Sequence, residues 1–84
     1  SLGTVPDFAY SGEGVRISGV SPNSAAEEAG LQAGDVLLSY NGEPIADMQS
    51  YSNLLRQSAP GDTVSVDVLR AEEQFSINAT LKAR

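Results

Sequence analysis

One stretch of the sequence, residues 24–42, constrains the fold more than any other, because every local signal in it agrees with its neighbours. Ser24 is a good helix N-cap, and Glu27 lies three residues later, which is the spacing of a capping box. Residues 25–29 are alanine and glutamate and favour helix, while Gly30 supplies the left-handed conformation that ends one. Such a helix has little more than one turn, so it depends on tertiary packing, with Leu31 as the expected anchor.

The second half of the same stretch predicts a buried strand between two turns. Gly34 and Asp35 are typical turn residues. Residues 36–40 form a short apolar run with the length and flanks of a buried strand. Asn41 and Gly42 both tolerate positive φ, so this pair predicts a tight turn after the strand.

The rest of the chain adds more strands and a second helix. Apolar and polar residues alternate over residues 15–20, 63–69 and 75–81, and the last two runs read as a hairpin. Its connection, residues 71–74, has no glycine, so we expect a loop that is longer or less regular than a two-residue turn. Asp47 can cap a helix over residues 48–58, on which Tyr51, Leu54 and Leu55 share an apolar face. The predicted fold class is therefore mainly β with two helices.

Composition limits the classes of function. The chain has 84 residues, enough for one domain, and a net charge of −6 with only five scattered basic residues. Nucleic acids and anionic membrane surfaces both attract clusters of lysine and arginine, so we expect neither as a partner. No stretch approaches the length of a membrane span. Cysteine is absent, which excludes disulfides and thiol chemistry within these residues.

Catalytic chemistry has little support in the sequence. Histidine, the commonest general base and transition-metal ligand, is absent. Lys82 is the only lysine; a serine–lysine dyad is not excluded by count, but its place in a strand pattern favours a solvated surface role. The acidic residues include adjacent pairs but no Asp-x-Asp-x-Asp loop, which favours a solvated acidic surface over a calcium site. We predict no catalytic residues, no metal and no cofactor, and therefore a domain that is not itself an enzyme.

The stretch Ser-Ala-Ala-Glu-Glu-Ala-Gly-Leu-Gln-Ala-Gly-Asp-Val-Leu-Leu-Ser-Tyr-Asn-Gly resembles the short helix and following strand of bacterial PDZ domains. The family form has Ser-Pro-Ala, then Ala-Gly-Leu, Gly-Asp-Val-Ile and a final Asn-Gly; here Ala25 replaces the usual proline. The resemblance extends from Leu2 to Leu81. It implies a PDZ-like, partly opened β-barrel of five or six strands that binds extended peptides, most often C-termini.

The resemblance also implies a binding site. In this family a loop of hydrophobic-Gly-hydrophobic form presents successive backbone N–H groups to a peptide carboxylate, which makes a small anion nest. Leu2, Gly3 and Thr4 match that loop, although Thr4 replaces a usual apolar residue. The alternative interpretation of these residues is a frayed N-terminus.

The family's second helix forms the other wall of the peptide groove. Met48, Ser52 and Leu55 fall on one stripe of the predicted helix and would line this wall. Leu2, Thr4, Met48 and Leu55 would form the pocket for the final side chain of the peptide. Met48 and Leu55 are also compatible with a plain core role. No charged side chain stands on the stripe, so we expect a wide preference for apolar or small C-terminal residues.

Residues 5–10 should form the strand that borders the groove, with Val5 and Pro6 beside the peptide. Pro6 has no N–H and is tolerated only at sheet edges or bulges. Because hydrogen-bonding direction alternates along a strand, Pro6 faces the same way as Thr4 and leaves one bond to a peptide unmade. This leaves two hypotheses open for the groove, a peptide-binding module and a structural or regulatory appendage with a degenerate groove. The absence of histidine and cysteine opposes the third hypothesis, an enzyme in its own right.

The start Leu-Gly-Thr-Val-Pro-Asp-Phe resembles the PDZ domains of secreted or periplasmic zinc aminopeptidases, which are related to those of HtrA-like proteases. This second resemblance implies that residues 1–84 are a single domain from a larger chain that is a zinc aminopeptidase or another protease. It also implies a periplasmic or secreted location. We expect the isolated domain to be monomeric and its partners to be peptide or protein C-termini.

Overall fold

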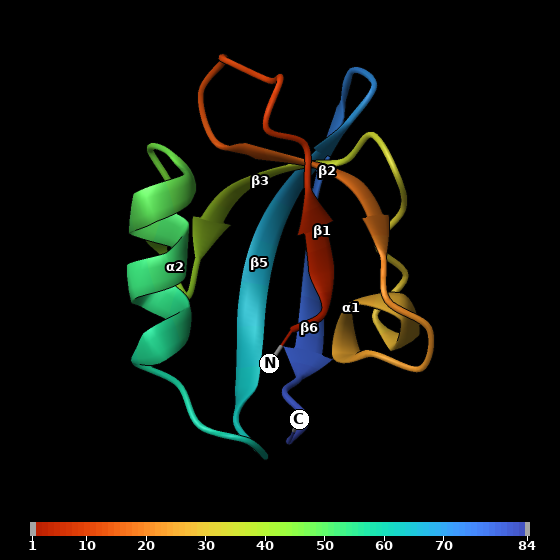
Figure 1. Cartoon of the computed structure of the whole chain (residues 1–84), viewed down its shortest axis with the longest axis vertical. Coiled ribbons are helices and arrows are strands. Elements are labelled where there is room, and N and C mark those ends of the chain that lie inside the picture. The colour runs from red at the N-terminus through yellow and green to blue at the C-terminus, as the bar shows by residue number, and fades with distance from the viewer. Residues whose placement is uncertain (1, 84) are drawn as a thin grey trace.

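The structure is a computed structural model that describes residues 2–83, and it contains six strands and two helices (Figure 1). In chain order the elements are β1 (Thr4–Pro6), β2 (Val15–Val20), α1 (Ala25–Glu28), β3 (Val36–Tyr40), β4 (Glu43–Pro44), α2 (Met48–Arg56), β5 (Thr63–Arg70) and β6 (Glu73–Thr80).

The strands form one antiparallel sheet in the order β1-β2-β3-β5-β6, with β4 paired to β3. β2 joins two parts of it, since Val15 and Arg16 pair with β3 while the later residues of β2 pair with β1. Within the described residues no strand pairing closes β1 onto β6. The sheet is thus a partly opened barrel, which confirms the predicted fold class. Figure 1 shows α1 and α2 on opposite sides, with β1 between them in this view.

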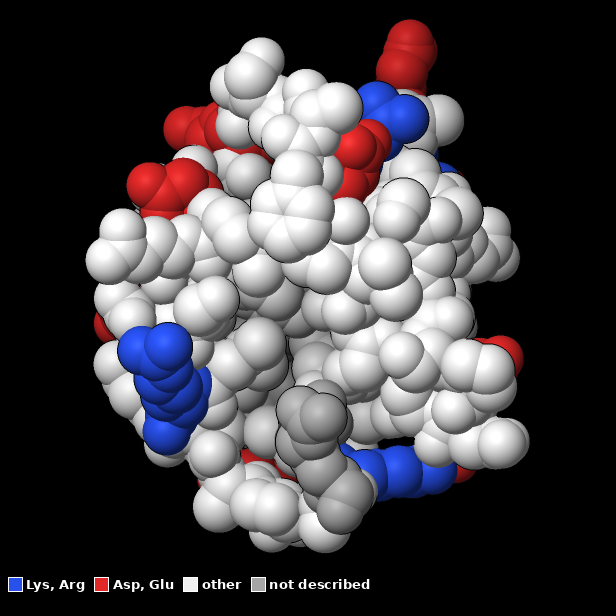
Figure 2. Space-filling view, viewed as in Figure 1, with Lys and Arg blue, Asp and Glu red and all other residues white. Residues whose placement is uncertain are grey.

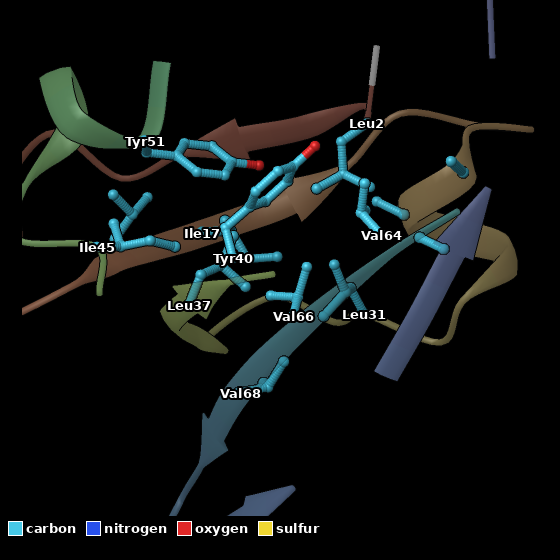
Figure 3. Close-up of a cluster of buried hydrophobic side chains, with 14 of the residues drawn as sticks. Leu2, Ile17, Leu31, Leu37, Tyr40, Ile45, Tyr51, Val64, Val66 and Val68 are labelled. Atoms are coloured by element: carbon cyan, nitrogen blue, oxygen red, sulfur yellow. The ribbon is translucent and has the colours of Figure 1, made fainter. Parts of the chain in front are cut away.

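The helix and strand predicted around residues 24–42 are present. The Ser24 side chain accepts a hydrogen bond of 3.1 Å from the Glu27 amide, which caps α1. Gly30 has a φ of +93°, the conformation expected at the helix end. Leu31 is buried in the core beside the inward-facing residues of the sheet (Figure 3). The fully buried large side chains include Leu2, Ile17, Leu37, Tyr40, Ile45, Tyr51, Val64, Val66 and Val68.

The strand predicted over residues 5–10 is wrong in length. β1 ends at Pro6, and residues 7–14 form a loop instead. Asp7 starts a turn there, because its side chain accepts from the Ala9 amide and its carbonyl accepts from the Tyr10 amide. The apolar Phe8, which suggested a continuing strand, is 82% exposed.

The predicted irregular connection between the last two strands is also wrong. β5 and β6 pair as far as Arg70 and Glu73, so only Ala71 and Glu72 make the turn. Ala71 has a φ of +55° and takes the left-handed conformation without being glycine. The second helix is shorter than predicted, since it ends at Arg56 rather than at residue 58.

An ion pair between a buried carboxylate and a partly exposed arginine holds one end of the sheet, and the sequence did not reveal it. Asp35 has no exposed surface and accepts two hydrogen bonds of 2.9 Å from Arg70 and one from the Gln32 amide. Burial by itself raises the pKa of Asp35, but the bonds from Arg70 and Gln32 outweigh it and leave the pKa below its usual value. The pair therefore stabilises the fold. No helix in the described part of the chain is long and apolar enough to cross a membrane.

Candidate functional site

An open cavity of about 540 Å³ lies between β1 and α2. Figure 2 shows that this face is uncharged over much of its middle, while acidic side chains gather at its upper end. Six of the eight residues predicted for the site line the cavity: Leu2, Gly3, Thr4, Pro6, Met48 and Leu55. The other two do not. Val5 is 43% exposed outside it, and Ser52 is half-buried on another part of α2.

The loop of Leu2, Gly3 and Thr4 is ordered by its contact with α1 rather than frayed. The carbonyl of Leu2 accepts a hydrogen bond of 2.8 Å from the Ala26 amide, and that of Gly3 accepts one of 2.8 Å from the Ser21 amide. Among residues 2–83, no group accepts a hydrogen bond from the amides of Leu2 and Gly3. These donors are therefore available at the end of the cavity.

Only glycine fits at position 3. Gly3 has a φ of +89°, and a Cβ built on it would lie 2.2 Å from the Cβ of Ser24. The loop therefore packs directly against the N-cap residue of α1. A side chain at this position would push the loop away from α1 and displace its amides.

The edge of β1 that borders the cavity has no neighbouring strand in the described structure. The carbonyl of Gly3 accepts a hydrogen bond from the amide of Ser21, just after β2, and the amide of Asp7 donates one to the carbonyl of Arg16 in β2. Because backbone groups alternate along a strand, those of Thr4 and Pro6 point the other way, to the open edge. The irregularity between Val5 and Pro6 leaves this alternation on β1 intact. Pro6 therefore presents a carbonyl but no N–H at the edge, as the sequence predicted.

The floor of the cavity contains a hydrogen bond that the sequence did not reveal. The hydroxyl groups of Thr4 and Tyr51 share a bond of 2.8 Å, which joins β1 to α2. Burial raises the pKa of Tyr51 to about 12, although the bond with Thr4 lowers it in part. The polar residue at position 4, where the family has an apolar one, was the available signal, since a buried hydroxyl requires a partner.

The wall formed by α2 is fixed by its first turn. Asp47 and Ser50 form a capping box, in which the Asp47 side chain accepts from the Ser50 amide and the Ser50 hydroxyl accepts from the Asp47 amide. This places Met48, half-buried, at the start of the wall, with Leu55 two turns further along. A second cavity of about 240 Å³ shares Pro6 and Met48 with the first and continues to the loop that contains Phe8.

Lys82 lies in the cavity wall, near the Leu2–Thr4 end, and is not merely solvated. Its Nζ donates a bond of 2.9 Å to the carbonyl of Asn23 and forms an ion pair with the Glu28 carboxylate. In the described part of the chain, no group of three or more histidine, cysteine, aspartate or glutamate residues could hold a metal ion. The arrangement offers donors, an open strand edge and an apolar wall, which suit binding rather than bond cleavage.

The chain belongs to the PDZ domain family, since the family's profile matches residues 16–70. Among proteins of known identity, it is 38% identical over 71 residues to a probable periplasmic serine endoprotease DegP-like of Marinomonas sp. (strain MWYL1). It is 35% identical over 69 residues to the periplasmic serine endoprotease DegP of Escherichia coli (strain K12). These matches cover 84% and 82% of the chain but only 15% of each relative.

Two solved structures share the fold. A variant of the HtrA-type protease AlgW with a decapeptide has a TM-score of 0.84 at 29% identity, covering 100% of this chain and 29% of that one. An aminopeptidase N family protein from Idiomarina loihiensis has a TM-score of 0.78 at 26% identity, covering 94% of this chain and 12% of that one.

These comparisons correct one prediction and agree with another. The sequence relatives described above are serine endoproteases, so they do not support a zinc aminopeptidase as the parent protein and agree with the alternative of another protease. The aminopeptidase N family structure nevertheless shares the fold. Both relatives are named as periplasmic, which agrees with the predicted periplasmic or secreted location.

Proposed function

We propose that this domain binds extended peptides by their C-terminal ends. In this proposal the carboxylate accepts hydrogen bonds from the amides of Leu2, Gly3 and Thr4. The last residues of the peptide lie along the open edge of β1, opposite the wall formed by α2. The observation that carries the proposal is the pair of unused amides of Leu2 and Gly3 at the end of the cavity.

The physical chemistry of the site supports this ligand. Backbone N–H groups that converge on one point form an anion nest, and an open strand edge supplies further bonds to an extended chain. The final side chain of the peptide would lie against Leu2, Thr4, Met48 and Leu55, which favours small or apolar residues. Part of the AlgW chain is similar to this domain, and its structure was solved with a decapeptide, which supports the same class of ligand here.

We further propose that the domain is a non-catalytic module of a longer protease chain and presents peptide ends to it. The support is the serine endoprotease identity of the relatives, of which this chain spans only 15%. The missing N–H of Pro6 favours a second candidate, in which the groove is degenerate and the domain makes structural contacts within its own protein.

Affinity measurements separate these functions. The probe is a pool of N-acetylated hexapeptides with a free C-terminus that differ in the final residue, which is alanine, valine, leucine, phenylalanine, aspartate or lysine. The same pool is made with amidated C-termini. Charge-assisted hydrogen bonds are about twice as strong as neutral ones, so we expect amidation to weaken binding by about tenfold. No binding of either pool would favour the structural role, whereas equal affinity for both pools would contradict capture of the carboxylate.

A pair of variants tests whether the groove is the place of binding. Met48→Asp puts a negative charge into the groove, while Gln49→Asp puts the same charge on the exposed neighbour in the same first turn of α2. An acidic residue in this turn is compatible with the helix. We expect the first variant to lose the free-acid peptides and the second to retain them. Equal effects of both would contradict a site between β1 and α2.

A further inference from the structure

The cavity has one charged side chain among its described lining residues, and this residue is Lys82. Lys82 follows the buried Leu81 just after β6, so the backbone at this point is fixed by the core. Its ammonium group bonds the carbonyl of Asn23, which itself lines the cavity, and pairs with Glu28 on α1. The last segment of the chain thus brings a cation to the end of the cavity that holds Leu2 and Gly3.

The surroundings of this cation are acidic. Glu28 holds the ammonium group, and the adjacent Glu27 accepts a hydrogen bond of 2.7 Å from the Asn23 amide. The whole chain carries a net charge of −6. A carboxylate that approaches this end of the cavity therefore meets two glutamates from α1, and Lys82 is the cation that opposes their repulsion.

We propose that Lys82 and Glu28 form an exchangeable ion pair that sets the affinity of the groove for carboxylates. Lys82 attracts the carboxylate of a peptide, and Glu28 competes with it for the same ammonium group. This inference rests on the proposed function and adds to it a charged contact outside the backbone amides.

The exchange is physically accessible. The side chains of Lys82 and Glu28 are 42% and 61% exposed, so neither is held in place by burial. Lysine carries three rotatable donors on a flexible stem, so Nζ can keep its bond to the Asn23 carbonyl while a ligand carboxylate competes with Glu28. An exposed ion pair of this kind is weak, so a ligand carboxylate can compete with it.

Two variants break the same ion pair but change the carboxylate contact in opposite directions. Lys82→Met removes the attraction, and we expect the free-acid peptide to bind about threefold to fivefold more weakly, the upper part of the range of an exposed ion pair. Glu28→Gln removes the competitor, and we expect about twofold tighter binding by the same reasoning. The probe is the member of the hexapeptide pool with the highest affinity, measured as free acid and as amide.

Two controls carry the same charge changes away from the cavity. Arg56→Met removes a cation from the exposed end of α2, and Glu72→Gln removes an anion from the exposed β5–β6 turn. We expect both to change the affinity by much less than the paired variants. We also expect raised salt to reduce the effects of Lys82→Met and Glu28→Gln, because both are electrostatic.

The outcomes are distinct. Opposite changes for the free acid, with little change for the amide, would support the exchangeable pair. If Lys82 and Glu28 only hold the chain end against α1, both variants will lower the free energy of unfolding and change the affinity in the same direction. This result would overturn the inference, while the proposed function would stand. If the unmodified domain binds no free-acid peptide, the proposed function fails, and the inference fails with it.

Discussion

Replacing Gly3 by alanine should damage both the fold and the site, and the structure gives the size of the effect. The added Cβ would lie 2.2 Å from the Cβ and 2.7 Å from the Oγ of Ser24, far inside ordinary contact distance. Gly3 also has a φ of +89°, at which a side chain costs about 1–2 kcal/mol. Relief of the clash requires Ser24 to move, and loss of its cap on α1 costs about 1 kcal/mol more. We therefore expect Gly3→Ala to lower the free energy of unfolding by roughly 2–3 kcal/mol.

Gly42→Ala is the matched control. Gly42 has a similar φ of +81°, but a Cβ there would have no atom within 4 Å. This variant carries the same backbone strain and the same loss of entropy in the unfolded chain, without the clash. We expect it to lower the free energy of unfolding by about 1–2 kcal/mol and to leave peptide binding unchanged.

Urea unfolding followed by circular dichroism measures both variants, and titration with the free-acid peptide pool gives their affinities. The close contact of Gly3 with Ser24 predicts that the Gly3 variant is the less stable of the two and loses affinity for the free acid. Equal stability and full binding by both variants would refute the close contact between the loop and α1 as the reason for glycine.

Three further changes test other parts of the account. Asp35→Asn should lower the free energy of unfolding by about 2 kcal/mol at pH 7, because the buried carboxylate loses its charge-assisted hydrogen bonds from the partly exposed Arg70. Since the folded pKa of Asp35 is lowered, this stabilisation is present above the unfolded value of about 4 and is lost as the pH falls through the folded value. Urea unfolding should therefore show the variant and the parent converging in acid. Tyr51→Phe should cost about 1 kcal/mol in urea unfolding because it leaves the Thr4 hydroxyl without its partner. The same change should remove from the ultraviolet titration the tyrosine that ionises with a pKa of about 12, and a tyrosine that still titrates there in the variant would contradict the assignment. Because Tyr51 is buried in its neutral form, its contribution to the free energy of unfolding is lost as the pH rises from about 10 through that value. Pro6→Ala should restore an N–H at the open edge and tighten peptide binding by about 1 kcal/mol, or roughly fivefold, in the affinity assay, whereas unchanged affinity would place the peptide elsewhere.

Local signals were enough to predict most of the fold. The N-cap at Ser24, the left-handed stop at Gly30 and the alternation of the strands depend on neighbours within a few residues, and the structure contains all of them. The short strand β1 was overestimated because Phe8 is apolar yet exposed. The turn after β5 was misjudged because Ala71 adopts a conformation that alanine seldom takes.

The candidate site was only partly predictable because its defining contacts join residues that are distant in the sequence. The bond between Thr4 and Tyr51 spans 47 positions, and the pair of Glu28 and Lys82 spans 54. No local pattern encodes such contacts, since they depend on how the sheet brings separate elements together. The resemblance to a family predicted the loop and the groove. The hydrogen bond between Thr4 and Tyr51 and the ion pair between Lys82 and Glu28 were found only in the structure.

The most direct test of the account is an NMR titration of the domain, which follows backbone amide shifts with the free-acid hexapeptides and then with their amides. Binding of a carboxylate by the loop predicts shifts at the amides of Gly3 and Thr4 that disappear when the peptide is amidated. Smaller shifts along β1 and α2 should remain with the amides at higher concentration. No shift at Gly3 and Thr4 with millimolar free-acid peptide, or the same shifts with acid and amide, would contradict carboxylate capture as the function of this groove.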